Sequence, residues 1–261
     1  MSPQHIHDRF FREAFSRPDV VADFIQAYLP TDFSSQLSME TLVRLEDSHV
    51  DESLGQYYVD LLYSVTFGSQ AITIALLLEH KSYPEEYPHF QLNQYLLNYW
   101  RDQLKEKQAL RPVVPIVIYH GSSVWKQRPM TAYFTTFDAP LTRFLPDFEY
   151  YLINLTGDPD NKFGLLTSAY ARLTAGLLKT IRQKQQLKKM LADLSSVIDK
   201  LTGDASGEQF VKTALLYVGY GSGLTNVEVF VVFKNISSKT ERIAMSAFEQ
   251  LEAEYIEKGA Q

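Results

Sequence analysis

Two acids that could hold a metal ion, and a lysine that could act beside it, lie in or directly after two apolar stretches of the chain. Asp60 interrupts the stretch of residues 57–65, while Glu79 and Lys81 follow the stretch of residues 71–78, with His80 between them. Placing two carboxylates and an ammonium group at the ends of apolar strands costs free energy unless they pair or bind a metal. The arrangement therefore indicates a functional site, and two acids with a lysine could hold a magnesium ion beside the phosphate of a phosphodiester bond during hydrolysis.

The expected geometry brings these groups together. Gly68 and Ser69 predict a hairpin turn between the two stretches, so Glu79 lies roughly opposite residue 58, and a small register shift or bulge brings Asp60 into diagonal reach. Two converging carboxylates suit Mg²⁺, which prefers oxygen ligands, and the carbonyl of His80 would supply a further oxygen. Lys81, on the same side of the strand as Glu79, would orient the attacking water or stabilise charge on the phosphate.

Plainer interpretations stay open. Asp60 and Lys81 would in that case form only a salt bridge at the rim of the sheet. An apolar strand before Glu79, an acid in the preceding strand and an amphipathic helix afterwards together favour the catalytic interpretation. On that helix Gln91 and Tyr95 share a face and would contact the metal or a DNA phosphate. Alternatively, Tyr95 belongs to the core and Gln91 is a solvated neighbour.

Basic residues after the same helix are candidates for contacts with a phosphate backbone, although each alone is more typical of a solvated surface. They are Lys105, Lys107, Arg111, Lys126 and Arg128. No histidine spacing indicates a zinc site, and no glycine-rich phosphate loop or Gly-x-Ser-x-Gly motif occurs.

The composition is that of an ordinary globular protein of 261 residues, 45% hydrophobic and 21% charged. The absence of cysteine excludes disulfides and thiolate metal sites. No signal peptide and no apolar run of membrane-spanning length is visible, so we expect a soluble, cytoplasmic protein without membrane contact. The net charge of −6 argues against a protein that coats nucleic acid, but it leaves room for a local basic cleft, because salt screens charges beyond about 10 Å.

The periodicity predicts a mixed sheet followed by helices. Residues 7–29 should be helical with a break near Pro18, residues 41–45, 56–67, 70–80, 113–119 and 150–154 should be strands, and residues 89–108 should form a helix. A helix between two strands usually makes them parallel, so the hairpin should gain a parallel neighbour. From about residue 163 the pattern is helical, with residues 227–233 ambiguous because of their strand propensity. We therefore expect an α/β core over residues 1–160 and a helical region over residues 161–261.

Several blocks of sequence resemble the Rpn family of bacterial recombination-promoting nucleases, also described as YhgA-like putative transposases. The blocks lie within residues 5–155 and are His7–Phe15, Val21–Phe24, Tyr28–Pro30, Tyr57–Val65, Leu78–Ser82 and Val114–Gly121. The resemblance implies a PD-(D/E)XK restriction-endonuclease-like core with a central mixed sheet flanked by helices. It also implies Mg²⁺-dependent DNA endonuclease activity and a role in recombination, with Mn²⁺ or Ca²⁺ as substitute metals.

Carried over to this chain, the resemblance matches Asp60 and Glu79 to the two acids and Lys81 to the lysine of that site. Many relatives carry glutamine where this chain has Lys81, and Val59 stands where the superfamily motif has proline. Gln91 and Tyr95 are similar to a Gln-x-x-x-Tyr helix motif of exonuclease-like relatives. The rival hypotheses are a catalytically silent nuclease fold that binds a partner and a transposase-like strand-transfer protein. A homodimer formed through the helical region would suit two cuts on two strands.

Overall fold

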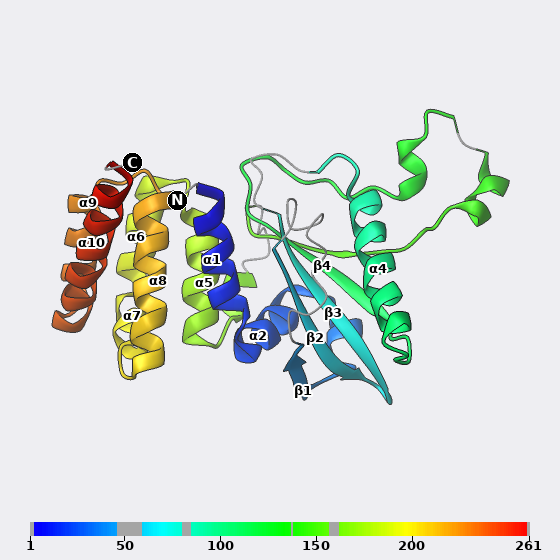
Figure 1. Cartoon of the computed structure of the whole chain (residues 1–261), viewed down its shortest axis with the longest axis horizontal. Coiled ribbons are helices and arrows are strands. Elements are labelled where there is room, and N and C mark those ends of the chain that lie inside the picture. Colours follow the sequence, from blue (N-terminus) through cyan, green and yellow to red (C-terminus); the bar gives the residue numbers. More distant parts are fainter. Residues whose placement is uncertain (1–2, 46–58, 80–84, 137, 157–161, 260–261) are drawn as a thin grey trace. The chain divides into compact units, whose positions relative to one another are not determined.

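The computed structural model describes residues 3–45, 59–79, 85–136, 138–156 and 162–259. The chain forms two compact units, one made of Met1–Ala27 together with Asn161–Gln261 and the other made of Tyr28–Asp160. We call them the helical unit and the sheet unit (Figure 1).

The sheet unit contains a five-stranded mixed sheet in which the strands follow one another in chain order. The strands are β1 (Leu37–Arg44), β2 (Val59–Phe67), β3 (Gln70–Glu79), β4 (Val113–Tyr119) and β5 (Tyr151–Asn154). β1, β2 and β3 pair antiparallel, whereas β3, β4 and β5 pair parallel. The predicted α/β class and mixed sheet are confirmed.

The turn between β2 and β3 fixes how these two strands are paired. Gly68 has φ +58° at the first central position, as a II′ hairpin turn requires, and Ser69 is the second. Pairing then runs without a shift from Phe67–Gln70 to Val59–Leu78. The register shift that the sequence suggested is therefore absent from the paired part of the hairpin.

Helix α4 (Pro88–Lys105) connects β3 to β4 and packs against one face of the sheet (Figure 1). Its buried residues Leu92, Tyr95 and Tyr99 form one core cluster with Leu62 of β2 and with Val117 and Tyr119 of β4. The opposite face carries a second set of fully or almost fully buried side chains, Leu61, Tyr63, Ile74, Ile116 and Ile118. Burial of both faces explains why the sequences of these strands are nearly continuous apolar runs.

Short helices complete the sheet unit. They are α3 (Thr31–Ser34) and the 3₁₀ helices η1 (Met130–Tyr133) and η2 (Ala139–Phe144), the last two in the long connection between β4 and β5. Phe33 of α3 stacks on Phe67 of β2 with ring centroids 5.2 Å apart.

The helical unit is built around a long, largely buried helix, α8. Its elements are α1 (Pro3–Phe15), α2 (Pro18–Tyr28, which ends at the unit boundary), η3 (Lys162–Leu165), α5 (Ala169–Thr180), α6 (Lys184–Asp193), α7 (Ser195–Leu201), α8 (Ala205–Gly221), α9 (Asn226–Lys234) and α10 (Ser238–Gly259). The ambiguous residues 227–233 lie in α9. A capping box between Thr225 and Glu228 starts that helix, and Val229 and Phe233, four residues apart, are buried, so capping and packing outweigh the strand propensity.

The first 27 residues pack with the C-terminal helices. Phe10 is fully buried and stacks on Tyr217 of α8 with ring centroids 4.3 Å apart, and Nδ1 of His7 lies 2.9 Å from the Tyr217 hydroxyl. Burial raises the pKa of Tyr217, so this phenol stays neutral at every physiological pH. The division into domains 1–160 and 161–261 stays a prediction. In the structure α1 packs with the C-terminal helices, because α8 covers its apolar face.

Candidate functional site

The backbone pairing fixes where two of the predicted site residues lie. Asp60 of β2 pairs with Leu77 of β3, and Glu79 is the last residue of β3, two positions further along. Positions 60 and 79 are therefore diagonal neighbours on one face of the sheet, about 7–8 Å apart. His80 and Lys81 lie outside the described residues. The catalytic and metal-binding roles of all four residues stay predictions.

Helix α4 covers the same face of the sheet. Thr73 of β3 pairs with Ser64 of β2, and the Thr73 hydroxyl lies 3.0 Å from that of Tyr99 in α4. Since residues alternate between the faces of a strand, Thr73 shares its face with Glu79 and Ser64 shares its face with Asp60. Tyr99 meets the beginning of β3, so the N-terminal half of α4 lies toward the end of β3 that carries Glu79.

That half of α4 contains Gln91 and Tyr95, the residues predicted to bind substrate. Tyr95 is 6% exposed and belongs to the core cluster described above, in agreement with the plainer interpretation of this residue. Gln91 is half-buried, and its Oε1 atom is buried without a hydrogen-bond partner among the described residues. The Gln91 side chain therefore has an acceptor that no described residue uses. Contact of Gln91 or Tyr95 with substrate stays a prediction.

A cavity of about 440 Å³ lies beside the first turn of α4, lined in part by His89, Arg128, Asp147 and Tyr150. Nδ1 of His89 lies 2.6 Å from the hydroxyl of Tyr133, and the guanidinium carbon of Arg128 lies 4.7 Å from the centre of the Tyr133 ring. Tyr133, which lies outside the lining, therefore contacts two side chains of this cavity, those of His89 and Arg128.

Burial determines the protonation states in this cavity. It lowers the pKa of His89, against the opposing effect of the Asp147 carboxylate, so His89 is neutral at pH 7. Burial also raises the pKa of Tyr150 to about 12. The sequence analysis did not identify His89 or Tyr133, because nothing in a lone histidine after Pro88 indicates a partner 44 residues away.

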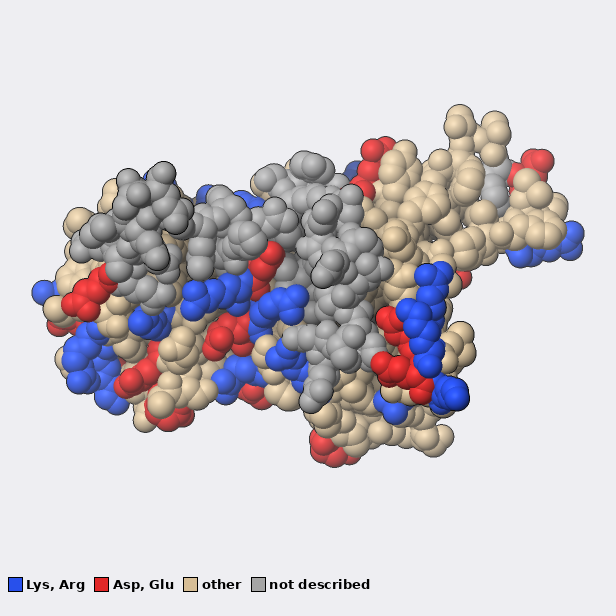
Figure 2. All heavy atoms as spheres, viewed as in Figure 1, with Lys and Arg blue, Asp and Glu red and all other residues tan. Residues whose placement is uncertain are grey.

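The predicted phosphate-contacting residues do not gather at Glu79. Nζ of Lys105 lies 2.7 Å from a carboxylate oxygen of Asp102, and Nη1 of Arg111 donates to the hydroxyl of Ser64 at 3.3 Å. Ser64 pairs with Thr73, six residues before Glu79, which corresponds to about 20 Å along the strand. Blue and red spheres lie together at the end of α4 in Figure 2.

Lys105 is thus ion-paired and Arg111 bonds to the far end of the strands, and contact of the basic residues with a phosphate backbone stays a prediction. Arg128 is engaged with Tyr133 beside the first turn of α4, and Lys126 is exposed.

The metal site expected from the sequence would use carboxylates, the ligand type that a hard divalent cation prefers. Among the described residues, no group of three or more His, Cys, Asp or Glu side chains could hold a metal ion. Binding of Mg²⁺ by Asp60 and Glu79, whose backbone positions are diagonal neighbours, stays a prediction.

Comparison with known proteins identifies the family to which this chain belongs. Residues 5–209 match the family described as putative transposase, YhgA-like, and the chain belongs to this family. The resemblance seen in the sequence is confirmed. The five-stranded mixed sheet flanked by helices is consistent with the nuclease-like core that the resemblance implied.

Relatives from Escherichia coli (strain K12) are similar over most of the chain. Recombination-promoting nuclease RpnC is 26% identical over 206 residues, which cover 78% of this chain and 67% of RpnC. Recombination-promoting nuclease RpnA is 27% identical over 68% of this chain and 61% of its own length. The inactive recombination-promoting nuclease-like protein RpnE is 27% identical over 75% of this chain and 62% of its own length.

The chain thus spans about three-fifths to two-thirds of these relatives. No solved structure matches it. Within the described residues, none of the helices has both the length and the apolar character needed to cross a lipid bilayer.

Proposed function

We propose that this protein is a metal-dependent DNA endonuclease that hydrolyses phosphodiester bonds and promotes recombination. The observation that carries the proposal is the unshifted β2–β3 pairing, because it makes positions 60 and 79 diagonal neighbours on the face covered by α4. The names of RpnC and RpnA support nuclease chemistry and a role in recombination.

In this proposal each residue has one role. The carboxylates of Asp60 and Glu79, with the carbonyl of His80, would hold Mg²⁺, and Mn²⁺ or Ca²⁺ would substitute. When bound, the metal supplies charge neutralisation at the phosphate and a lower pKa for bound water. Lys81 would position the attacking water, and Gln91 would contact the substrate from α4.

A second candidate is a nuclease fold that binds a partner without turnover. The relative RpnE, named inactive, is as similar to this chain as RpnA is, so similarity alone does not separate the two candidates. Metal binding and cutting therefore have to be measured separately.

The test is incubation of supercoiled plasmid with the purified chain, with Mg²⁺ or with a chelator. We expect nicked or linear product only with metal, and at least a 100-fold loss for Asp60→Asn, Glu79→Gln and Lys81→Met, since loss of even outer-shell partners costs 10–100-fold. Glu40→Gln, at an exposed position of β1, is the matched control and should cut like the wild type.

Thermal unfolding with and without Mg²⁺ separates the candidates. A nuclease should gain stability from the metal, by about 2.7 kcal/mol at a concentration of 100 Kd, and Glu79→Gln should abolish this gain. Normal cutting by all three site variants would refute the proposed function. A folded wild type that neither cuts nor responds to metal would favour the silent fold.

A further inference from the structure

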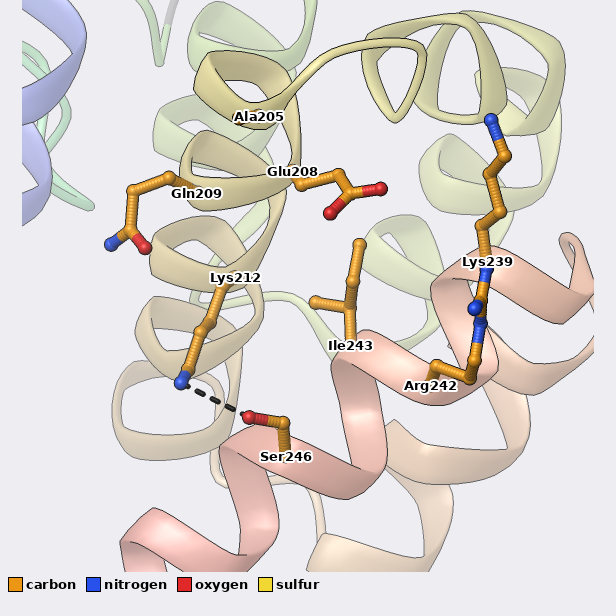
Figure 3. A pocket seen from close by; sticks show the side chains of 8 residues that line it. All are labelled: Ala205, Glu208, Gln209, Lys212, Lys239, Arg242, Ile243 and Ser246. Carbon is orange, nitrogen blue, oxygen red and sulfur yellow. Dashed lines mark hydrogen bonds between the residues drawn. The ribbon is translucent and has the colours of Figure 1, made fainter.

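A groove with an unusual charge arrangement lies between α8 and α10 of the helical unit (Figure 3). Its volume is about 340 Å³. α8 contributes Glu208 and Lys212, and α10 contributes Lys239, Arg242 and Ile243. In Figure 3 the carboxylate of Glu208 and the side chain of Ile243 point into the space between the two helices.

The cations of this groove have no acidic partners among the described residues. Nζ of Lys212 donates to the hydroxyl of Ser246 at 3.2 Å, and Nζ of Lys239 donates to the carbonyl of Thr202 at 3.2 Å, so each is held by a neutral oxygen. Arg242 is exposed and forms no ion pair within the described residues. The three cations less the Glu208 carboxylate (3 − 1) leave the groove with a net charge of +2, and hydrogen bonds to neutral oxygens hold the two lysines in place.

Other lysines of the same unit behave differently. Lys188 forms an ion pair with Glu228 at 2.7 Å, and Lys234 forms one with Glu241 at 3.2 Å. Ion pairs therefore form elsewhere on this unit, whereas the three cations of the groove form none within the described residues.

The position of two of these cations strengthens the local potential. Lys239 and Arg242 lie in the first turns of α10, which begins at Ser238. The N-terminus of a helix carries a partial positive charge, so lysine and arginine are favoured at the other end. An anion in the groove would relieve this repulsion.

We propose that the groove binds a phosphate-bearing ligand about the size of a mononucleotide. Lys212, Lys239 and Arg242 would contact phosphate oxygens, Ile243 would pack against the base or sugar, and Glu208 would accept a hydrogen bond from a hydroxyl or amino group. A volume of about 340 Å³ suits such a small ligand.

This site goes beyond the proposed function and does not depend on it. Most of the groove follows residue 209, where the family match ends. Phosphate could come from a free nucleotide or from the phosphorylated end of a nucleic acid strand, so the experiment contains an arm for each source.

The test is isothermal titration of the full chain in a chelator, so that no cutting occurs. The probes are pyrophosphate, ADP, adenosine, and one short oligonucleotide with and without a 5′ phosphate. We expect binding of pyrophosphate and of ADP or the 5′-phosphorylated oligonucleotide, and no binding of adenosine. Preference for ADP would identify a free nucleotide as the ligand, and preference for the phosphorylated oligonucleotide would identify a strand end.

The variants test whether binding occurs in the groove. Arg242→Gln should weaken binding about tenfold or more, as expected for hydrogen bonds to a charged group, while Arg242→Lys should retain most of it. The control Lys184→Gln/Lys189→Gln changes two exposed lysines of α6 and should leave binding unchanged. Absence of binding to every phosphate-bearing probe, or an equal loss in the control, would overturn the proposal.

Discussion

Asp23 of α2 offers a sharp test of how the helical unit is held together. It is 6% exposed, and its carboxylate accepts hydrogen bonds from the backbone nitrogens of Thr167 and Ser168 at 2.8 and 2.9 Å and from the Thr167 hydroxyl at 3.0 Å. These groups lie directly before α5, so Asp23 satisfies donors at the start of a helix 144 residues away.

The change Asp23→Ala leaves two backbone donors without a partner. Each buried donor that loses its acceptor costs about 1–3 kcal/mol, so we expect a loss of roughly 2–6 kcal/mol in the free energy of unfolding. Since a domain is typically stable by only about 5–15 kcal/mol, this is a large fraction of the total.

The assay is urea unfolding followed by ellipticity at 222 nm. Asp19→Ala is the matched control on the same helix: the Asp19 side chain is 51% exposed and 3.6 Å from Nε of Arg17, so its loss should cost at most about 1 kcal/mol. Trp100 and Trp125 both lie in the sheet unit, so a shift in ellipticity without a shift in tryptophan fluorescence would localise the loss to the helical unit. Equal costs for the two variants would refute the reasoning.

Three further predictions concern pH and the hairpin turn. A hydrogen bond from Lys188 lowers the pKa of Glu228 to about 2 from 4.5, so the stability that the Glu228 carboxylate contributes is complete above pH 4.5 and is lost as the pH falls toward 2. Glu228→Gln should therefore make the melting temperature depend less on pH over this range. An unchanged pH dependence would contradict this role of Glu228. Burial lowers the pKa of His89 despite the nearby Asp147, so the unfolded chain takes up the proton first and the folded state loses stability as the pH falls below about 6.5. His89→Gln should therefore reduce the drop in urea midpoint between pH 7.5 and 5.5. A drop of the same size in the variant would refute this role of His89. Gly68→Ala forces a side chain onto φ +58° and should cost about 1 kcal/mol, whereas Gly68→Asn should cost less; equal urea midpoints for the two variants would argue against backbone strain at this turn.

Much of the sheet unit could be predicted from the sequence because its signals are local. The run of residues 113–119 forms β4 with the bounds expected, and Gly68–Ser69 forms the turn that sets the pairing of β2 with β3. That turn also brought Asp60 and Glu79 onto one face without any knowledge of the rest of the chain.

Other features depend on partners that periodicity does not reveal. The apolar face of α1 was visible in the sequence, but its cover, α8, begins about 190 residues later, and the contact of His7 with Tyr217 spans 210 residues. The basic residues after α4 seemed close to the site in sequence, yet Arg111 lies at the other end of the strands, because an 18-residue helix carries the chain back along the sheet.

The helical unit is built from two segments, Met1–Ala27 and Asn161–Gln261, and the residues of the sheet unit separate these segments in the sequence. On a ribosome, residues 28–160 would emerge and be free to collapse while α1, with its fully buried Phe10, still awaits α8. The nascent chain therefore carries the apolar face of α1 without its cover until α8 has been synthesised, and such transiently exposed surface favours aggregation.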